Sequence, residues 1–338
     1  MVSFQAKLAA GLAARGFEVC YHLSDLPFRS VLVIGGTRQL TGLWRVKRRG
    51  IRLVQRLDGM NWIQRALPTG VRHRMRAEYG NLLLATIRNR LVDAVVYQSR
   101  FARDWWERVY GKTRTPVQVI HNGVDLDLFT PQGEGERPGW VRVLLVEGSL
   151  MGGYEHGLAN ALDLVLGLAE EVSSPPGNQR IELLIAGRVS ADQQALWERR
   201  LAERNVENRV FISWSGLIPH PCIPEIDRSA HLLYSADLNP ACPNAVVEAL
   251  ACGTPVLAFD TGALPELVTG DAGRVVPYGG NPWRLERPDV PALVRGAVEI
   301  LGDQERFRSG ARARAEEALS LDRMVDRYLS VLLDEPED

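Results

Sequence analysis

Residues 239–268 place polar side chains at the points where predicted strands and helices meet. Pro243 and Asn244 are expected to begin a helix, because proline suits a first turn whose N–H groups have no partner within the helix. The unpaired amides of such a turn attract an anion such as a phosphate. Glu248 follows about one turn later, where its carboxylate could accept hydrogen bonds from the hydroxyl groups of a ribose.

A second turn of the same kind contains Thr261, Gly262 and Ala263, between a predicted strand and a short predicted helix. It offers further amides and one hydroxyl group. Two helix starts beside one carboxylate would suit a nucleoside diphosphate, with the phosphates on the amides. From the residues alone, ordinary packing of strand, turn and helix, with Glu248 exposed, is an equal alternative.

The spacing of apolar residues predicts that strands and helices alternate along the whole chain. In the first part, strands are predicted at residues 17–22, 30–34, 51–56, 94–97 and 117–120, and helices at 4–15, 39–49, 71–91 and 100–110. In the second part, strands are predicted at 141–146, 181–186, 210–212, 232–235 and 256–259, and helices at 158–170, 191–204, 245–251, 264–268, 290–301 and 307–333. Such alternation is typical of parallel sheets with helices on both faces, so the predicted fold class is α/β.

The segment between these parts, PQGEGERPG at residues 131–139, has no apolar residue and is predicted to be a linker. With 338 residues, the chain is long enough for two domains of about 150 residues each. We place an N-terminal domain at residues 1–130 and a C-terminal domain at 140–311. Ligands of parallel sheets bind beyond the carboxyl ends of the strands, so a cleft between the two domains is the expected site.

The charge balance argues against a nucleic-acid partner, because Lys+Arg 40 nearly cancels Asp+Glu 41. Residues 45–56 and 72–76 are nevertheless basic, and form either solvated helix faces or a surface for anionic lipid or an anionic acceptor. The four cysteines lack the spacing of a metal site and suit a reducing cytosol. No apolar run is long enough to span a membrane, and residues 1–15 lack the continuous apolar core of a signal peptide.

Several segments together resemble the motifs of glycosyltransferase family 4, whose members are retaining enzymes with the GT-B fold. The sequence EALACGTPV at 248–256 is similar to the family's nucleotide-binding signature, and DTGALPELV at 260–268 is similar to the turn that follows it. VIHNGVD at 119–125 is similar to the strand between the family's domains, and YQSRF at 97–101 to the corner before it. Residues 315–328 look like the last helix of that fold.

The resemblance implies two Rossmann-like domains facing across a cleft, with a C-terminal helix at 312–333 that packs back on the N-terminal domain. It implies that Glu248 binds the ribose and that Asn122 and Gly123 shape the hinge. A turn that needs positive φ explains Asn122 and Gly123 equally well without any ligand. The other donor-binding residues that the resemblance implies are Asn244, Ala245, Thr261, Gly262 and Ala263.

Two departures from the family pattern concern the donor site. The first glutamate of the family, which contacts the donor sugar, falls on Pro240, and Asn239 is one interpretation of what replaces it. The arginine and lysine that clamp the diphosphate fall near Ser149 and His156, and neither is a permanent cation. A diphosphate leaving group needs its developing charge neutralised. Arg188, after a predicted strand, is a candidate stand-in for this diphosphate contact, and the alternative is an ordinary surface arginine.

A third departure concerns the start of the sequence. Members of the family usually begin with a strand and a glycine-rich loop before the first helix, whereas this sequence starts within or just before that helix. We expect either that the given sequence starts late or that the N-terminal sheet lacks its first strand. Loss of a central strand would leave unpaired backbone groups on both neighbouring strands.

On the acceptor side, Asp58 follows the strand predicted at 51–56 and is a candidate catalytic residue that could hold an acceptor hydroxyl. A helix cap or a turn explains Asp58 at least as well. His22 ends the strand predicted at 17–22 and has the same two interpretations.

Together these features predict a hexosyltransferase-type enzyme that moves a sugar from a nucleotide-sugar donor to an acceptor hydroxyl, with retention of the anomeric configuration. No metal or other cofactor is expected, because the sequence has no acidic cluster of the DxD kind positioned to bind one and the fold that the resemblance implies usually works without it. The expected acceptor is a glycan, a lipid-linked glycan or a polysaccharide precursor, and the expected location is cytoplasmic, with peripheral contact at the inner membrane face. The alternatives are a non-catalytic nucleotide- or glycan-binding relative that kept the GT-B fold, and another GT-B enzyme such as a sugar-phosphate epimerase or a phosphorylase.

Overall fold

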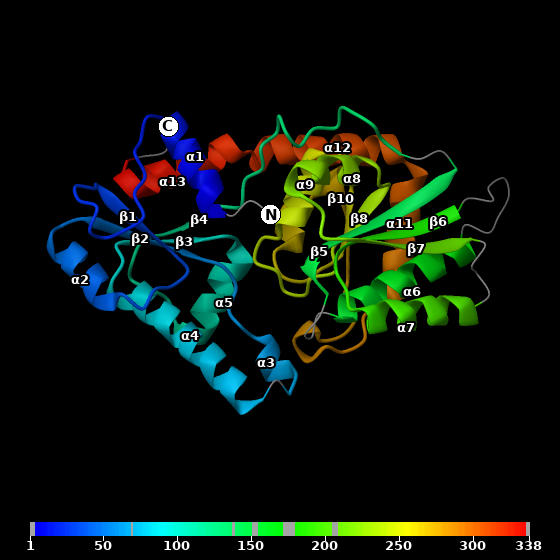
Figure 1. Ribbon diagram of the computed structural model, residues 1–338, viewed down its shortest axis with the longest axis horizontal. Coiled ribbons are helices and arrows are strands. Elements are labelled where there is room, and N and C mark those ends of the chain that lie inside the picture. The colour runs from blue at the N-terminus through cyan, green and yellow to red at the C-terminus, as the bar shows by residue number, and fades with distance from the viewer. Residues whose placement is uncertain are drawn as a thin grey trace. The chain divides into compact units, whose positions relative to one another are not determined.

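The structure is a computed structural model, and it describes residues 4–68, 70–136, 139–150, 155–171, 180–204 and 209–335. The chain divides into two compact units. We call them the first unit, formed by residues 2–123 and 319–338, and the second unit, formed by residues 124–318. Figure 1 labels most of the helices and strands of both.

The first unit contains a four-stranded parallel sheet with the strand order β1-β2-β3-β4. Its strands are β1 (Ser30–Ile34), β2 (Arg52–Leu57), β3 (Ala94–Tyr97) and β4 (Val117–Val119). Its helices are α1 (Phe4–Ala14), α2 (Leu40–Arg48), α3 (Ile63–Ala66), α4 (Val71–Arg90), α5 (Arg100–Tyr110) and α13 (Leu321–Leu333). Helices α2, α4 and α5 connect successive parallel strands, and such crossovers are right-handed, which places them on one face of the sheet.

Successive residues of β2 show what covers each face of this sheet, because neighbouring side chains in a strand point to opposite sides. Gln55 donates a hydrogen bond to the carbonyl of Leu84 in α4 at 3.3 Å. Its neighbour Val54 lies in an apolar cluster with Leu8 of α1 and Tyr328 of α13. The sheet is therefore covered on both faces, by α4 on one and by α1 and α13 on the other.

The second unit contains a six-stranded parallel sheet with the strand order β10-β9-β8-β5-β6-β7. Its strands are β5 (Trp140–Ser149), β6 (Arg180–Arg188), β7 (Val210–Gly216), β8 (Leu232–Tyr234), β9 (Val256–Phe259) and β10 (Gly273–Val276). Its α-helices are α6 (Glu155–Glu171), α7 (Ala191–Glu203), α8 (Ile223–Arg228), α9 (Asn244–Ala251), α10 (Leu264–Leu267), α11 (Val290–Gly302) and α12 (Gln304–Ala318). Strands β8 and β9 are fully buried, as expected for the centre of a sheet covered on both faces.

Residues 17–22 form no strand, so the prediction of a strand there was wrong. Phe17 and Val19 pack against the core of the first unit, which explains the apolar alternation that suggested a strand. Among the described residues, however, β1 pairs only with β2, and no strand pairs with residues 17–22. The alternation therefore reports burial without the hydrogen-bonded ladder that defines a strand.

The single helix predicted at residues 307–333 consists of two helices, α12 and α13. The break occurs before Ser320, whose hydroxyl accepts a hydrogen bond from the Arg323 N–H at 3.1 Å and so caps α13. Residues up to Ala318 belong to the second unit, and α13 belongs to the first. Only the second part of the helix implied at 312–333 therefore packs with the N-terminal sheet.

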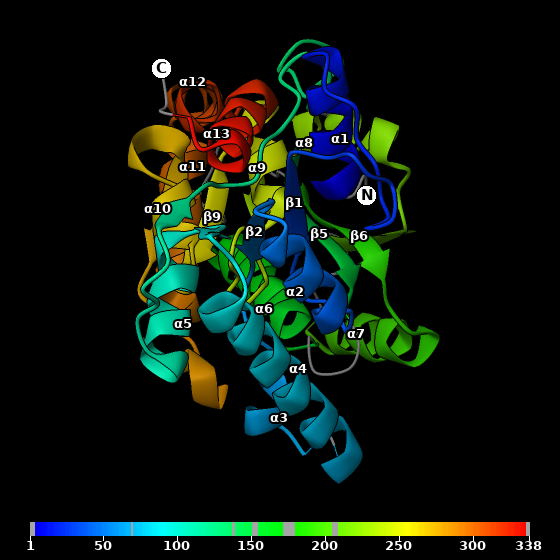
Figure 2. The same cartoon turned by 90° about the vertical axis from the view of Figure 1, so that its left-hand side faces the viewer.

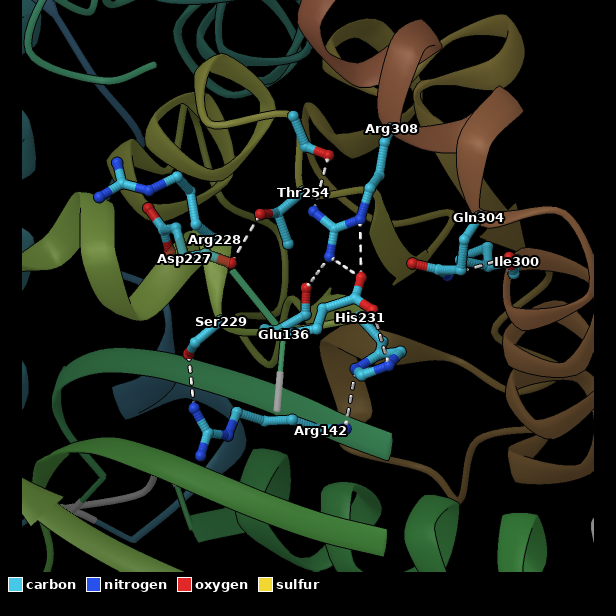
Figure 3. A network of polar contacts seen from close by, with 12 residues as sticks. Glu136, Arg142, Asp227, Arg228, Ser229, His231, Thr254, Ile300, Gln304 and Arg308 are labelled. Carbon is cyan, nitrogen blue, oxygen red and sulfur yellow. Dashed lines mark hydrogen bonds and ion pairs between the residues drawn. The ribbon is translucent and has the colours of Figure 1, made fainter. Parts of the chain in front are cut away.

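The segment that precedes β5 is held to the second unit by Arg308 of α12, as Figure 3 shows. Arg308 donates hydrogen bonds to Glu136 at 2.8 Å and to the carbonyl of Ala230 at 2.6 Å. Glu136 also lies 3.1 Å from Nε2 of His231. The hydrogen bond with His231, and then the charge of Arg308, lower the pKa of Glu136 to about 2. This carboxylate therefore fixes the segment through two ionisable neighbours.

Two further arginines bind backbone carbonyls of the same segment. Arg312 donates to the carbonyl of Phe129 at 2.8 Å, and Arg228 donates to the carbonyl of Thr130 at 3.2 Å. These contacts explain why the chain divides directly after Gly123 and not near residue 130. Polar and glycine-rich composition marked the segment as a linker, but composition does not reveal that arginines distant in sequence hold it.

Candidate functional site

The carboxyl ends of the strands in the second sheet bring together residues that the sequence singled out, and ligands of parallel sheets bind at such an edge. The order of β9, β8, β5 and β6 places the turns after these strands next to one another. These turns carry Thr261 after β9, Asn239 after β8, Ser149 at the end of β5 and Arg188 at the end of β6. This edge is the candidate functional site.

The turns after β8 and β9 pack directly against each other. The N–H of Ala263 donates a hydrogen bond to the carbonyl of Pro240 at 2.8 Å. Gly262 has a φ of 61°, and a Cβ at this position would lie 2.4 Å from the Pro240 nitrogen, so only glycine fits. Pro240 therefore serves as the packing partner of the second turn, and the Ala263 amide that was expected to contact a diphosphate is bonded within the protein.

Two buried polar groups in these turns have no hydrogen-bond partner among the described residues. They are the Thr261 hydroxyl and the Asn239 side-chain amide nitrogen, on residues that are 3% and 5% exposed. Asn239 also has a φ of 56°, which is uncommon for a residue other than glycine. Buried polar groups normally have partners, and strained backbone gathers at ligand sites, so these groups are the ones best placed for a bound ligand.

Helix α9 begins at this edge without a side-chain cap. Its N-cap residue is Pro243, which provides no side-chain hydrogen bond to the first turn. Asn244 and Ala245, in its first turn, are half-buried. The first amides of a helix carry partial positive charge and lack partners within the helix, and an anion would complete them.

Glu248 of α9 is 4% exposed, so the alternative of an exposed carboxylate was wrong. Its Oε1 lies 3.3 Å from Nε2 of His220, whose ring packs edge-on against Phe129 with centroids 5.3 Å apart. Neither of Asp227's carboxylate oxygens, which are buried nearby, has a hydrogen-bond partner among the described residues. Burial, and then the charge of Glu248, raise the pKa of Asp227 well above its ordinary range.

Two acidic residues at the same edge escaped the sequence analysis as site residues. Glu147 lies near the end of β5, and Asp237 follows the neighbouring strand β8. Burial, and then the charge of Asp237, raise the pKa of Glu147 to about 8, and burial raises the pKa of Asp237 to about 6. An acidic residue within a few positions of the end of an apolar run is the signal that could have found each of them.

Ser149 and Arg188, both considered for the diphosphate, are brought together by the structure. They are register partners on β5 and β6, and the N–H of Leu150 donates to the carbonyl of Arg188 at 3.0 Å. The Arg188 side chain is exposed and forms no ion pair with any residue that the structure describes. His156 is exposed in the first turn of α6, while the preceding residues 151–154 lie outside the described part of the chain.

In the first unit, Asp58 follows β2 directly and is exposed. It caps no helix, because the next helix, α3, begins only at Ile63 with Trp62 as its N-cap. Its backbone carbonyl accepts a hydrogen bond from Nε1 of Trp106 at 2.7 Å, which fixes the chain at this point. His22 lies in an exposed loop and ends no strand, since the strand predicted there does not form.

Asn122 and Gly123 end the first part of the first unit. The Oδ1 of Asn122 accepts a hydrogen bond from Nη2 of Arg56 at 2.8 Å. Neither residue has a positive φ, so a turn of that kind does not explain them. Glycine is needed at 123 because a Cβ would lie 2.7 Å from the Cα of Leu321, at the start of α13.

The described residues offer neither a cluster of metal ligands nor a helix that could span a membrane. They contain no group of three or more His, Cys, Asp or Glu side chains that could hold a metal ion. None of their helices combines the length and the apolar character needed to cross a bilayer. All four cysteines are free thiols, and Cys20 and Cys222 are exposed.

Two protein families match different parts of the chain. Residues 31–128 match the model described as "Glycosyltransferase Family 4", and residues 149–303 match the model described as "Glycosyl transferases group 1". The first match lies almost entirely in the first unit, and the second match lies within the second unit. Together they cover most of the chain.

Curated relatives and solved structures agree with these matches. A D-inositol 3-phosphate glycosyltransferase of Xylanimonas cellulosilytica is 29% identical over 66% of this chain and 52% of its own length. A GDP-mannose-dependent alpha-(1-6)-phosphatidylinositol dimannoside mannosyltransferase of Mycobacterium tuberculosis is 27% identical over 71% of this chain and 57% of its own. The chain thus spans about half the length of these relatives.

Two solved structures share the fold along nearly the whole chain. Sucrose-phosphate synthase from Thermosynechococcus elongatus superposes with a TM-score of 0.65 at 16% identity, covering 97% of this chain and 77% of that one. Anabaena Alr3699/HepE in complex with UDP superposes with a TM-score of 0.63 at 17% identity, covering 98% and 82%. At such identities the likeness concerns the arrangement of the backbone.

Proposed function

Because the chain belongs to glycosyltransferase family 4 and has two Rossmann-like parallel-sheet domains of the GT-B type, we propose that it is a retaining glycosyltransferase. It would move a hexose from a nucleotide-sugar donor to an acceptor hydroxyl. One observation carries the proposal: the uncapped start of α9 lies at the same sheet edge as two buried polar groups without partners, those of Thr261 and Asn239.

The donor nucleotide would occupy this edge of the second sheet. Glu248 would accept hydrogen bonds from the ribose hydroxyls, and the amides of Asn244 and Ala245 would face the phosphates. Thr261 would donate its unpartnered hydroxyl, and the Gly262 amide would lie beside it. Arg188 is the exposed cation of this edge, and we propose that it compensates the diphosphate in place of the family's arginine and lysine.

The reaction breaks the bond between the sugar C1 and the diphosphate oxygen and forms a bond between C1 and the acceptor oxygen. The acceptor proton passes to the departing diphosphate, so the chain's own residues need only hold and orient the reactants. Asp58 would hold the acceptor hydroxyl, and no metal is required in this scheme. Asn239 would contact the donor sugar from the position next to Pro240.

The rival function is a nucleotide-binding relative without catalysis. The pair Glu147 and Asp237 favours it, because two acids at this edge, once they ionise, would oppose the negative charge that develops on a departing diphosphate. Pro240 favours it too, because proline cannot replace the hydrogen bonds of a glutamate. Transfer of sugar therefore has to be measured separately from binding.

For the acceptor we propose a glycan, a lipid-linked glycan or a polysaccharide precursor. The name of the relative from Mycobacterium tuberculosis includes a lipid, phosphatidylinositol dimannoside, which supports this class. We further propose that the protein works in the cytoplasm, where its four free thiols would stay reduced, and that it touches the inner membrane face as a peripheral protein.

The test of the donor site is calorimetry with UDP and GDP on the wild type and on Glu248→Ala. Loss of hydrogen bonds to a charged group costs about 1–3 kcal/mol, so nucleotide affinity should fall roughly 5- to 150-fold. Glu225→Ala is the matched control, since Glu225 is an exposed glutamate on the neighbouring helix α8.

Unchanged nucleotide affinity in a folded Glu248→Ala protein would remove Glu248 from the site. Release of free nucleotide from a panel of nucleotide sugars, with and without glycan acceptors, separates transfer from binding. Tight nucleotide binding with no turnover for any donor would establish the rival function.

A further inference from the structure

Helix α4 of the first unit exposes a line of large apolar side chains. Val71 is 76% exposed, Met75 is 69% exposed, and Tyr79 and Leu82 are each 57% exposed. Their spacing of four, four and three residues places all four on one face of the helix. The buried residues of α4 lie on its other faces, and they are Ala77, Asn81, Ala85, Ile87 and Arg88. We call the exposed line the apolar stripe of α4.

Uncompensated positive charge lies along both sides of the apolar stripe. Arg72, Arg74 and Arg76 are exposed and form no ion pair with any described residue. The acidic residue nearest to the stripe, Glu78, is already bound by Arg65 at 2.6 Å. The whole chain has a net charge of -1, so this basic face is local and does not reflect the composition.

Helix α2 carries exposed residues of the same two kinds. In the two views of Figures 1 and 2 it lies beside the C-terminal half of α4, on the same side of the first sheet. Trp44 of α2 is 49% exposed, and the guanidinium of Arg48 lies over its ring at 4.7 Å. Arg45 and Arg49 beside them are exposed as well. The pattern of exposed apolar and basic residues therefore covers two neighbouring helices.

We propose that the apolar stripe of α4, together with Trp44 of α2, docks on an anionic lipid surface. An amphipathic helix in this setting lies in the plane of the interface, with apolar side chains in the acyl boundary and arginines among the headgroup phosphates. Tyrosine and tryptophan favour the same interfacial layer. The inference deepens the peripheral membrane contact in the proposed function by naming the surface that makes it.

Two other occupants fit the observations less well. A soluble polyanion would be held by the arginines but would leave Val71, Met75 and Leu82 in water. A second copy of this chain would cover the apolar residues but would bring the arginines of two copies together without acidic partners. An anionic bilayer is the partner that satisfies both features.

The experiment is flotation of the protein with vesicles of phosphatidylcholine alone and of equal parts phosphatidylcholine and phosphatidylglycerol. The wild type should float with the anionic vesicles and much less with the neutral ones. Each arginine near an anionic surface contributes about fivefold in affinity, so a triple Arg72→Gln, Arg74→Gln, Arg76→Gln variant should bind roughly a hundredfold more weakly. The double variant Met75→Gln, Leu82→Gln should also lose flotation.

The matched control is Leu217→Gln, because Leu217 is 59% exposed but lies in the second unit. It should float like the wild type, and an equal loss in this variant would overturn the placement on α4. Equal flotation with neutral and anionic vesicles, or concentration-dependent dimers without lipid binding, would overturn the proposal. Calorimetry with UDP on the same variants tests the donor site separately, so either idea can fail without the other.

Discussion

The two units are built on the same parallel-sheet plan and both bury polar atoms without partners among the described residues, yet the features behind the two proposals differ between them. The second unit buries polar groups without partners at the ends of its strands, including the Thr261 hydroxyl and the Asn239 amide. The first unit exposes apolar side chains along the outer face of α4, such as Met75. The ends of its strands carry the exposed Asp58.

This difference distinguishes two kinds of recognition. A buried polar group without a partner is costly unless a small ligand completes its hydrogen bonds. An exposed apolar stripe is costly unless a large surface covers it. The second unit therefore has the features of a small-molecule site and the first has those of a docking surface. Perturbing the second unit should leave the stability of the first unchanged, and the following predictions use that contrast.

The largest effect is expected for Arg308→Ala. The substitution removes hydrogen bonds to Glu136 and to the Ala230 carbonyl and leaves Glu136 with one ionisable neighbour fewer. Stability of the second unit should fall by about 2–4 kcal/mol. Hydrogen exchange should show faster opening of residues 124–136 and α12, with no change in β2 and β3. Arg295→Ala is the control, since that arginine is 71% exposed. A uniform loss of protection from hydrogen exchange in both units would contradict the expectation that the first unit is unaffected.

A smaller, pH-dependent effect is expected for Glu147→Gln. The pKa of Glu147 is about 8 in the folded protein against an ordinary value of 4.5. Between these values the folded state retains a proton that the unfolded state has released, so stability of the wild type falls as pH rises from about 4.5 to about 8. The variant should reduce this slope and gain about 2 kcal/mol at pH 8. Denaturation across this pH range measures it, and an unchanged slope would contradict the assignment.

The smallest effect is expected for Thr261→Val. Removing a buried hydroxyl that has no partner should stabilise the ligand-free protein by about 1 kcal/mol, while nucleotide affinity falls several-fold. Thr254→Val is the matched control, because the Thr254 hydroxyl donates to the carbonyl of Asp227 at 2.7 Å and its loss should destabilise. If both variants destabilise the protein equally and leave UDP binding intact, the Thr261 hydroxyl has no ligand role.

Apolar periodicity predicted much of the fold, because it reports which faces are buried. Strands β1, β3 and β9 and helix α5 have the bounds expected from the sequence. Strand β10 was missed because GRVV is short and begins at a glycine. The break between α12 and α13 was missed because it depends on a serine cap within a continuous helical pattern.

The position of the candidate site could be predicted, since the motif around Glu248 and the strand ends identify the edge of the second sheet. Contacts between segments that are distant in the sequence could not be predicted. The approach of His220 to Glu248 depends on the short helix η1 (His220–Cys222), and the proximity of Glu147 to Asp237 depends on the pairing of β5 with β8. Neither follows from local spacing.

The core of the first unit includes Val325 and Tyr328 of α13, which the ribosome makes only after every residue of the second unit. During synthesis, β2 and β3 must therefore wait with one face covered by α1 alone while the second unit folds. The usual order, in which the first domain made is the first to fold, is reversed here. A nascent chain stalled before residue 321 should carry a folded second unit and an unfinished first one.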